Sequence, residues 1–183
     1  MTYTDDQISQ LISEAAAVNG KYVTLSERLY SFAQTHPKSS EQILHGFLRR
    51  LGTLERCIEN VYTLYPPDRS AFPSPETCVD LAINLQSFVF NVFGCLDNLA
   101  WVWVIERSIR GKNGKQLKES QIGFSKDVVK ASFSKEFRSY VDGINEWFEY
   151  LENFRHALAH RIPLYVSPFF VTSDEAVPFQ PRF

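Results

Sequence analysis

The sequence predicts an all-α protein, and three observations lead to that prediction. Apolar residues recur at spacings of three and four over long stretches, as they do along one face of a helix. Ser, Thr and Pro stand where these stretches begin, and Gly or Pro where they end. No stretch before the C-terminal tail shows the alternation of apolar and polar residues typical of a half-buried β-strand. The 183 residues fit a single domain with a sizeable core.

Two helices are expected in the first 35 residues. Thr4 is a suitable N-cap for a helix from residue 5 to about residue 18, where Asn19-Gly20 permits a stop. A second helix is expected from about residue 24 to residue 35, before Pro37. Together with the next helix they would form an additional N-terminal helical layer over residues 1–70.

The third expected helix opens at Ser39 or Ser40 and ends at Pro66-Pro67, because proline does not continue a helix. Its apolar positions follow helical spacing throughout: Ile43, Leu44, Phe47, Leu48, Leu51, Leu54, Ile58, Val61 and Leu64.

Two long helices are expected in the second half of the chain. Ser74 followed by Pro75 is the pattern of an N-cap with proline at the first helical position, and that helix should run to about residue 109. A polar connection over 111–123 leads to a last long helix over about 132–161. This helix closes there because Pro163 disfavours helical angles at the residue before it. The proline-rich tail, residues 163–183, is expected to be extended.

Composition excludes several classes of protein. With 19 Lys+Arg against 21 Asp+Glu, the chain lacks the net positive charge of a general polyanion binder. Cys57, Cys78 and Cys95 form no CxxC pair, which argues against a disulfide framework or a zinc ribbon. No P-loop, GxGxxG, nucleophile elbow or HExxH occurs, so nucleoside triphosphate hydrolysis, dinucleotide binding and zinc proteolysis have no support, and no cofactor is expected. No second helix that bears His or Cys obviously completes a metal shell, so no metal ligands are assigned.

A cytoplasmic location is expected, with no membrane association. The first residues show no basic region followed by an apolar run, so they do not resemble a signal peptide. The longest apolar stretch, residues 88–105, is interrupted by Asn91, Asp97 and Asn98, and such groups are costly inside a bilayer.

A charged residue falls within an apolar arc on each of the two long helices. On a helical wheel, Arg155 lies between Leu151 and Ala159, and Asp97 lies in a stripe of aromatic residues. An isolated buried charge is costly, so we expect Arg155 within salt-bridge reach of a carboxylate, with Asp97 as the favoured partner. The two helices are expected to form the central antiparallel pair, with these apolar positions mostly buried: Leu85, Phe88, Val92, Leu96, Leu99, Phe137, Ile144, Phe148 and Leu151.

Arg155 and His160 are the candidate catalytic residues. Five positions along a helix rotate by about 140° and rise about 7.5 Å, so the two side chains leave the helix on different faces. Both are long, and at the end of a helix that stops at Pro163 they could converge on a phosphate. Imidazole would move a proton on or off a ribose oxygen, and guanidinium would stabilise charge on phosphorus. The products would be a 2′,3′-cyclic phosphate and a 5′-hydroxyl.

At this helix the chain resembles the HEPN superfamily (higher eukaryotes and prokaryotes nucleotide-binding), whose signature is Arg-x4-6-His on the final core helix. Arg155 and His160 match that signature, and Asp97 stands where such domains often carry a polar residue on the facing helix. The run Arg161-Ile162-Pro163-Leu164-Tyr165 also resembles a family of uncharacterised HEPN-like bacterial proteins. The resemblance covers residues 75–165.

The resemblance implies an HEPN-like up-and-down helical bundle that forms a homodimer, since the groove of such domains usually lies between two protomers. It implies a metal-independent endoribonuclease acting on RNA in a toxin–antitoxin or defence system, with an antitoxin or other protein partner. Many members have instead lost catalysis and serve as interaction or scaffold domains. His156 departs from the small polar residue common after the arginine in nuclease members, and with Asp97 and Arg161 it is a supporting residue.

Three further patterns leave alternatives open. Glu152, His156 and His160 share one stripe at four-residue spacing, which fits either a metal site or a solvated polar face. Asparagines recur every seven residues at 84, 91 and 98. They fit either hydrogen bonding across a helix pair or dimer interface, or the more solvent-accessible edge of a buried helix. Residues 107–138 hold nine basic side chains against three acidic ones, which fits either RNA binding or a solubilising loop.

Overall fold

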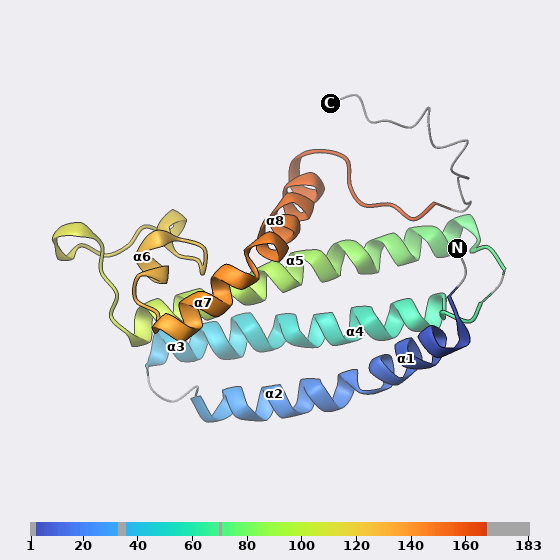
Figure 1. Ribbon diagram of the computed structural model, residues 1–183, viewed down its shortest axis with the longest axis horizontal. Coiled ribbons are helices and arrows are strands. Elements are labelled where there is room, and N and C mark those ends of the chain that lie inside the picture. Colours follow the sequence, from blue (N-terminus) through green and yellow to red (C-terminus); the bar gives the residue numbers. More distant parts are fainter. Residues whose placement is uncertain (1–2, 33–35, 70, 168–183) are drawn as a thin grey trace.

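The computed structural model describes residues 3–32, 36–69 and 71–167, with the side chains of Phe32 and Asn113 excepted. These residues form helices joined by turns, and the extended pairing among them is limited to a single bridge between Arg110 and Gln116. The predicted all-α class is therefore confirmed. The long helices lie side by side along one axis, and a shorter C-terminal pair crosses over them (Figure 1).

The N-terminal layer consists of α1 (Asp5–Ala16) and α2 (Val18–Phe32). Thr4 caps α1 as predicted, and its hydroxyl accepts from the backbone N–H of Gln7. The break falls at Ala17 instead of Asn19-Gly20, and α2 runs through both residues. Gly20 is exposed with open space around it, so its backbone is free to be helical and the local Asn-Gly signal is overridden.

The next helical stretch begins at Pro37, two or three residues before the predicted opening at Ser39 or Ser40. The short α3 (Pro37–Glu41) is capped by His36, whose Nδ1 accepts from the backbone N–H of Lys38. A π-helical turn, η1 (Gln42–Phe47), joins it to α4 (Leu48–Leu64), which ends before Pro66 as expected.

The longest helix, α5 (Pro75–Glu106), begins as predicted with Ser74 as N-cap and Pro75 at its first position. It ends three residues earlier than expected in a Schellman motif, in which the N–H of Ile109 donates to the carbonyl of Val104 and that of Ser108 to Ile105. Ser108 takes the left-handed position of this motif, with φ of 48°.

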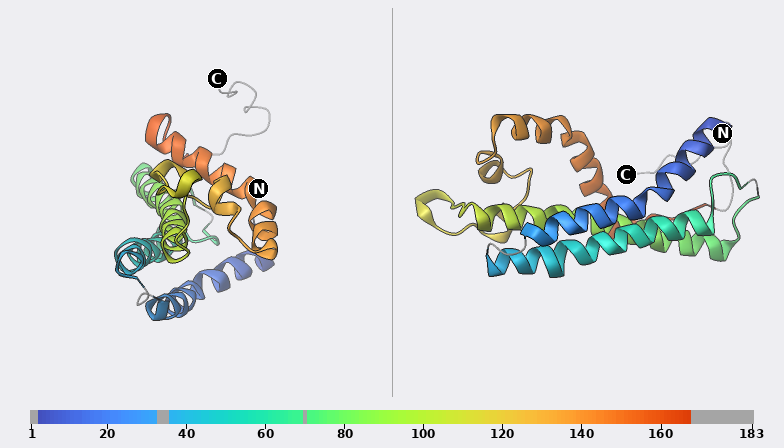
Figure 2. Two further views of the ribbon diagram at one scale, coloured as in Figure 1. Left: turned by 90° about the vertical axis from the view of Figure 1, so that its left-hand side faces the viewer. Right: turned by 90° about the horizontal axis from the view of Figure 1, so that it is seen from below.

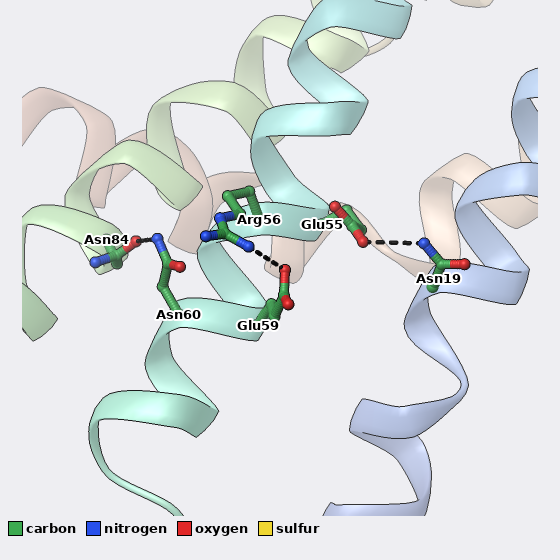
Figure 3. Close-up of polar contacts among 6 residues, drawn as sticks. All are labelled: Asn19, Glu55, Arg56, Glu59, Asn60 and Asn84. Atoms are coloured by element: carbon green, nitrogen blue, oxygen red, sulfur yellow. Dashed lines mark hydrogen bonds and ion pairs between the residues drawn. The ribbon is translucent and has the colours of Figure 1, made fainter.

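The central antiparallel pair is α4 and α5, not α5 and the last helix as the sequence predicted (Figure 1). Arg50 of α4 binds the asparagine stripe of α5, since its Nε donates to Asn98 Oδ1 (3.2 Å) and its Nη1 to Asn91 Oδ1 (3.3 Å). Farther along, Asn60 donates to Asn84 (2.9 Å), as Figure 3 shows. The asparagine repeat therefore hydrogen-bonds across a helix pair within the chain.

The N-terminal layer covers α4 on the side away from α5 (Figure 1). Asn19 of α2 donates to Glu55 of α4 (3.2 Å), and Figure 3 shows this contact beside the Arg56–Glu59 ion pair. Both contacts are exposed, so each adds little stability.

The main buried cluster lies where α5 ends. Short helical turns follow α5 in the connection, η2 (Lys112–Gly114), η3 (Glu119–Gln121) and α6 (Asp127–Lys130). Their apolar residues pack on the last turns of α5 and on the helix after them, and the cluster comprises Ala100, Val104, Ile122, Val129, Phe133 and Val141.

The predicted last helix is two helices, α7 (Lys135–Gly143) and α8 (Asn145–His160), which meet at a sharp angle (Figure 2). Gly143 is a poor helix former, and Ile144 after it leaves the helical angles (φ −108°, ψ 15°). The break lets Val141 join the buried cluster while α8 crosses α5.

Burial of the predicted apolar arcs is only partial. Leu151 is buried, and Phe88, Val92, Leu96, Leu99, Ile144 and Phe148 are half-buried. Leu85 and Phe137 are exposed, contrary to the prediction. Leu85 lines a cavity with Cys57 and Val61 of α4 and does not face α8. Phe137 lies on α7 at the edge of the aromatic cluster, where its ring contacts Trp103 and Phe133 but stays partly open to solvent.

After α8 the chain returns along the first half of α5. Gln86 donates to the carbonyl oxygen of Leu164 (2.6 Å), and Tyr165 and Val166 lie over Cys78 and Val79. Residues 163–167 have no regular secondary structure, in keeping with the predicted tail. The rest of that tail, 168–183, lies outside the described residues.

By length and composition alone, α5 is apolar enough to cross a membrane, and it is the one such helix in the described part of the chain. Core helices of soluble proteins pass the same test. The polar side chains at 84, 91 and 98 are engaged by α4 and η1.

Candidate functional site

Arg155 lies in a cavity between α5, α8 and the connection before α6. The cavity has a volume of about 260 Å³, and Phe93, Asp97, Lys126 and Glu152 also line it. The Arg155 guanidinium carbon lies 4.3 Å from the centre of the Phe93 ring, a cation–π contact. Its Nε is buried and has no hydrogen-bond partner among residues 3–32, 36–69 and 71–167. The Arg155 cavity therefore holds a cation whose hydrogen-bonding capacity is partly unused.

Asp97 lines the same cavity but forms no ion pair with Arg155 within 4.0 Å, so the predicted salt bridge is absent. Burial raises the pKa of the Asp97 carboxyl, and the charges of Arg155, Arg50 and Lys126 only partly offset that effect. The two side chains attract each other across the cavity without touching. The ring of Phe93 takes the place that a carboxylate was expected to hold against the guanidinium.

The sequence did not place Lys126, Ser120 and Ser125 at this site. They come from the connection before α6, which packs against α8 and closes the cavity. Lys126 appeared in the sequence only as one member of a basic segment. Its approach depends on the buried cluster of Ile122 and Val129 and on no local motif, so no sequence signal identifies it.

His160 and Arg161 lie outside the Arg155 cavity. Both are exposed at the C-terminal end of α8, where His160 is the last helical residue. The ring of His156 lies 6.2 Å from that of His160 between centres, and His156 Nε2 lies 3.8 Å from Glu152 Oε1. Within one chain, therefore, the structure brings Arg155 together with Asp97 but not with His160.

The stripe of Glu152, His156 and His160 does not form a metal site. No group of three or more His, Cys, Asp or Glu side chains within residues 3–32, 36–69 and 71–167 is arranged to hold a metal ion. Glu152 turns toward the Arg155 cavity, while the two histidines are exposed.

The basic segment has no single role. Lys130 pairs with Asp142, Arg107 lies 5.0 Å from the ring centre of Trp103, and Arg138 donates to the carbonyls of Lys130, Ala131 and Phe133. These three side chains support the fold. The remaining basic residues of the segment are exposed or line cavities: Arg110, Lys112, Lys115, Lys118, Lys126 and Lys135.

The fold and site define an all-α protein with an arginine-bearing cavity between its central and C-terminal helices. No protein-family model matches the chain, and no curated protein or solved structure does either.

Proposed function

We propose that this chain is an HEPN-like interaction domain that binds its partner through the surface formed by α5 and α8. The supporting observation is the separation of Arg155 from His160. Arg155 is half-buried against Phe93, whereas His160 is exposed outside the cavity. General acid–base catalysis at a phosphate needs both groups within hydrogen-bond reach of the same substrate, and His160 does not line the cavity that holds Arg155.

A metal-independent endoribonuclease of HEPN type is the second candidate. It is favoured by the exposed group of His156, His160 and Arg161 at the end of α8, which is open to RNA and to a second copy. In this proposal two copies bring their α8 ends together, as the resemblance implies, and the groove between them unites arginine and histidine. A role in a toxin–antitoxin or defence system and a cytoplasmic location belong to the same proposal.

The homodimer is part of both proposals. The outer face of α5 carries an apolar stripe of Val79, Ile83 and Phe90, which are 59%, 58% and 41% exposed. Exposed apolar residues in a row on one helix are typical of a protein–protein contact. A second copy of this chain, or an antitoxin-like protein, would cover them.

RNA cleavage in EDTA separates the two candidates. An interaction domain leaves a mixed-sequence RNA intact. The endoribonuclease would cleave it without a divalent ion, leave 2′,3′-cyclic phosphate ends, and lose about 100-fold or more of its rate in His160→Ala. His45→Ala, which changes a histidine of η1 far along the chain from α8, is the matched control and should behave as wild type. Cleavage with this pattern would overturn the interaction-domain proposal.

A further inference from the structure

A second cavity lies where α5 ends, and it shares only Ile122 with the Arg155 cavity. Its volume is about 370 Å³, within the range of small-molecule sites. It is enclosed by the start of α3, the last turns of α5 and the connection that follows, at the end of the molecule where α3 meets α5 (Figure 1). We refer to it as the α5-end cavity.

The charged side chains that line the α5-end cavity are all basic. Lys38, Arg110 and His36 line it, and no Asp or Glu among the described residues does. The Arg155 cavity, in contrast, contains both Asp97 and Glu152. Within the described part of the chain, neither Lys38 nor Arg110 forms an ion pair. Two exposed cations without carboxylate ion pairs, beside a cavity that is partly open to solvent, favour an anionic ligand.

His36 adds a directed donor to this set. Its Nδ1 accepts from the backbone N–H of Lys38 (3.2 Å), so in the neutral ring the proton is on Nε2. The imidazole is thereby fixed at the start of α3, with a donor left for a ligand.

The remaining wall of the α5-end cavity is apolar. Apart from Ser108 and Gln116, it is formed by Trp101, Val104, Ile105, Ile109, Leu117 and Ile122. Trp101, Ile109 and Leu117 also pack on the buried cluster. A wall tied to the core holds its shape. A flat apolar group placed against it would bury surface without requiring the wall to rearrange.

Ser108 lines the cavity and has a strained backbone conformation. It occupies the left-handed position of the Schellman motif at φ 48°, where glycine is the usual residue because it lacks a Cβ. A serine there is less stable than a glycine, and its side chain lines the cavity. A residue that is unfavourable for the fold but lines a cavity points to a role in binding.

We propose that the α5-end cavity binds a small organic anion, in which a phosphate or carboxylate is joined to a flat apolar body. Lys38, Arg110 and Ser108 hold the anionic group, and the body lies against Trp101. This site goes beyond the proposed function, because the residues that would hold the ligand belong neither to the Arg155 cavity nor to the end of α8, and Ile122 is the only lining residue the two cavities share.

Calorimetric titration of the full chain with phenyl phosphate and with benzoate tests the proposal and identifies the preferred anionic group. At least one of the two should bind, and more tightly than either inorganic phosphate or benzyl alcohol, which supply only one half of the ligand. Binding should weaken as salt is added, because exposed charges are screened. Equal binding of benzyl alcohol, or no binding of either aromatic anion, would overturn the proposal.

Charge-removing variants locate the site. Arg110→Gln and Lys38→Gln should each weaken binding of the preferred anion by about tenfold, as expected for a lost charged hydrogen bond. Lys112→Gln is the matched control, since Lys112 is an exposed cation of the same connection that does not line the cavity. An equal loss in the Lys112 variant would show that general charge, and not this cavity, attracts the anion.

Ser108→Gly separates binding from folding. The variant should raise the melting temperature, because glycine takes φ of 48° without strain. It should at the same time weaken binding several-fold, because the hydroxyl is removed. A more stable protein with unchanged affinity, together with unchanged affinity in Arg110→Gln, would overturn the proposal.

Discussion

At the residue scale, the most consequential difference from expectation is the environment of Asp97. The sequence predicted a buried ion pair with Arg155, for which removal of Asp97 would be strongly destabilising. In the structure Asp97 is half-buried beside Arg155 but not in contact with it, and burial outweighs the nearby positive charges. The ionised form of Asp97 is therefore less favourable in the folded protein than in the unfolded chain.

The first prediction follows from the sign of this pKa shift. The pKa of Asp97 is raised in the folded state, so its ionisation lowers stability once pH exceeds its unfolded value near 3.8. Asp97→Asn should therefore raise the melting temperature at pH 7. The gain should shrink as pH falls through the raised pKa and vanish below about pH 4. A variant less stable than wild type at pH 7 would restore the ion-pair interpretation. Thermal unfolding of both proteins, followed by circular dichroism from pH 7 to below pH 4, measures the difference in melting temperature.

The second prediction concerns the three cysteines, all of which are buried. Burial raises the pKa of the Cys95 thiol to about 11, an effect that Arg50 only partly offsets. Thiolate is the reactive form, so Cys95 should resist thiol reagents in the folded protein at pH 8. Ellman's reagent should release three equivalents quickly from denatured protein and far more slowly from native protein. Rapid labelling of Cys95 in native protein, identified by mass spectrometry, would contradict its burial.

At the element scale, the α4–α5 seam depends on a close approach at Gly94. A Cβ built there would lie 2.5 Å from the Arg50 guanidinium, which is the group that binds Asn91 and Asn98. Glycine at this position therefore allows Arg50 to lie across α5. The π-helical turn makes a similar approach, where a Cβ on Gly46 would lie 2.4 Å from the Asn98 amide.

The third prediction compares two glycine substitutions within helices. Gly94→Ala should lower the free energy of unfolding by about 1–3 kcal/mol, because the methyl group displaces Arg50 from its asparagine partners. Gly20→Ala is the matched control. It has open space around it in α2, so it should raise stability by about 0.5–1 kcal/mol through helix propensity alone. Urea unfolding measures both, and a stabilised Gly94→Ala would show that the seam tolerates the displacement.

The helices were predictable where their signals are local. Thr4, Ser74 with Pro75, and Pro66 after α4 mark observed ends, because capping and proline geometry involve only neighbouring residues. The break between α7 and α8 was missed because helical periodicity continues across Gly143. That break depends on Val141 packing into a cluster built from distant segments.

In the candidate site, too, only the features that depend on local geometry were predictable from the sequence. The wheel correctly placed Arg155 on an inward face, because helix rotation is fixed by geometry. It could not supply the partner of Arg155, since the approach of Phe93 and Lys126 depends on how α8 crosses α5 and how the connection folds back. The same holds for the α5-end cavity, whose cations come from the starts of two different segments.

At the scale of the whole molecule, the α5 helix has two different sides. One side is engaged by α4 through Arg50 and the asparagines. The outer stripe of Val79, Ile83 and Phe90 is exposed, although the same stripe farther along, at Phe93 and Asp97, is covered by α8. The C-terminal pair thus covers only half of this face, and residues 164–166 lie along part of the other half. The proposed dimer would cover the apolar surface that stays exposed.

The fourth prediction tests that dimer. Wild-type protein should sediment at about twice the 21.1 kDa chain mass, and Ile83→Lys should sediment as a monomer, because a charge buried at an apolar contact without a partner is very costly. Ile12→Lys is the matched control, since Ile12 of α1 is also exposed, at 47%, and lies in a different layer. Both variants should retain the helical circular dichroism spectrum, because neither side chain is part of the core.

A monomeric wild type would contradict the dimer, and loss of the dimer in both variants would show that the contact is not specific to α5. A dimer that persists in Ile83→Lys would place the contact elsewhere, with the exposed end of α8 at His160 as the next surface to change.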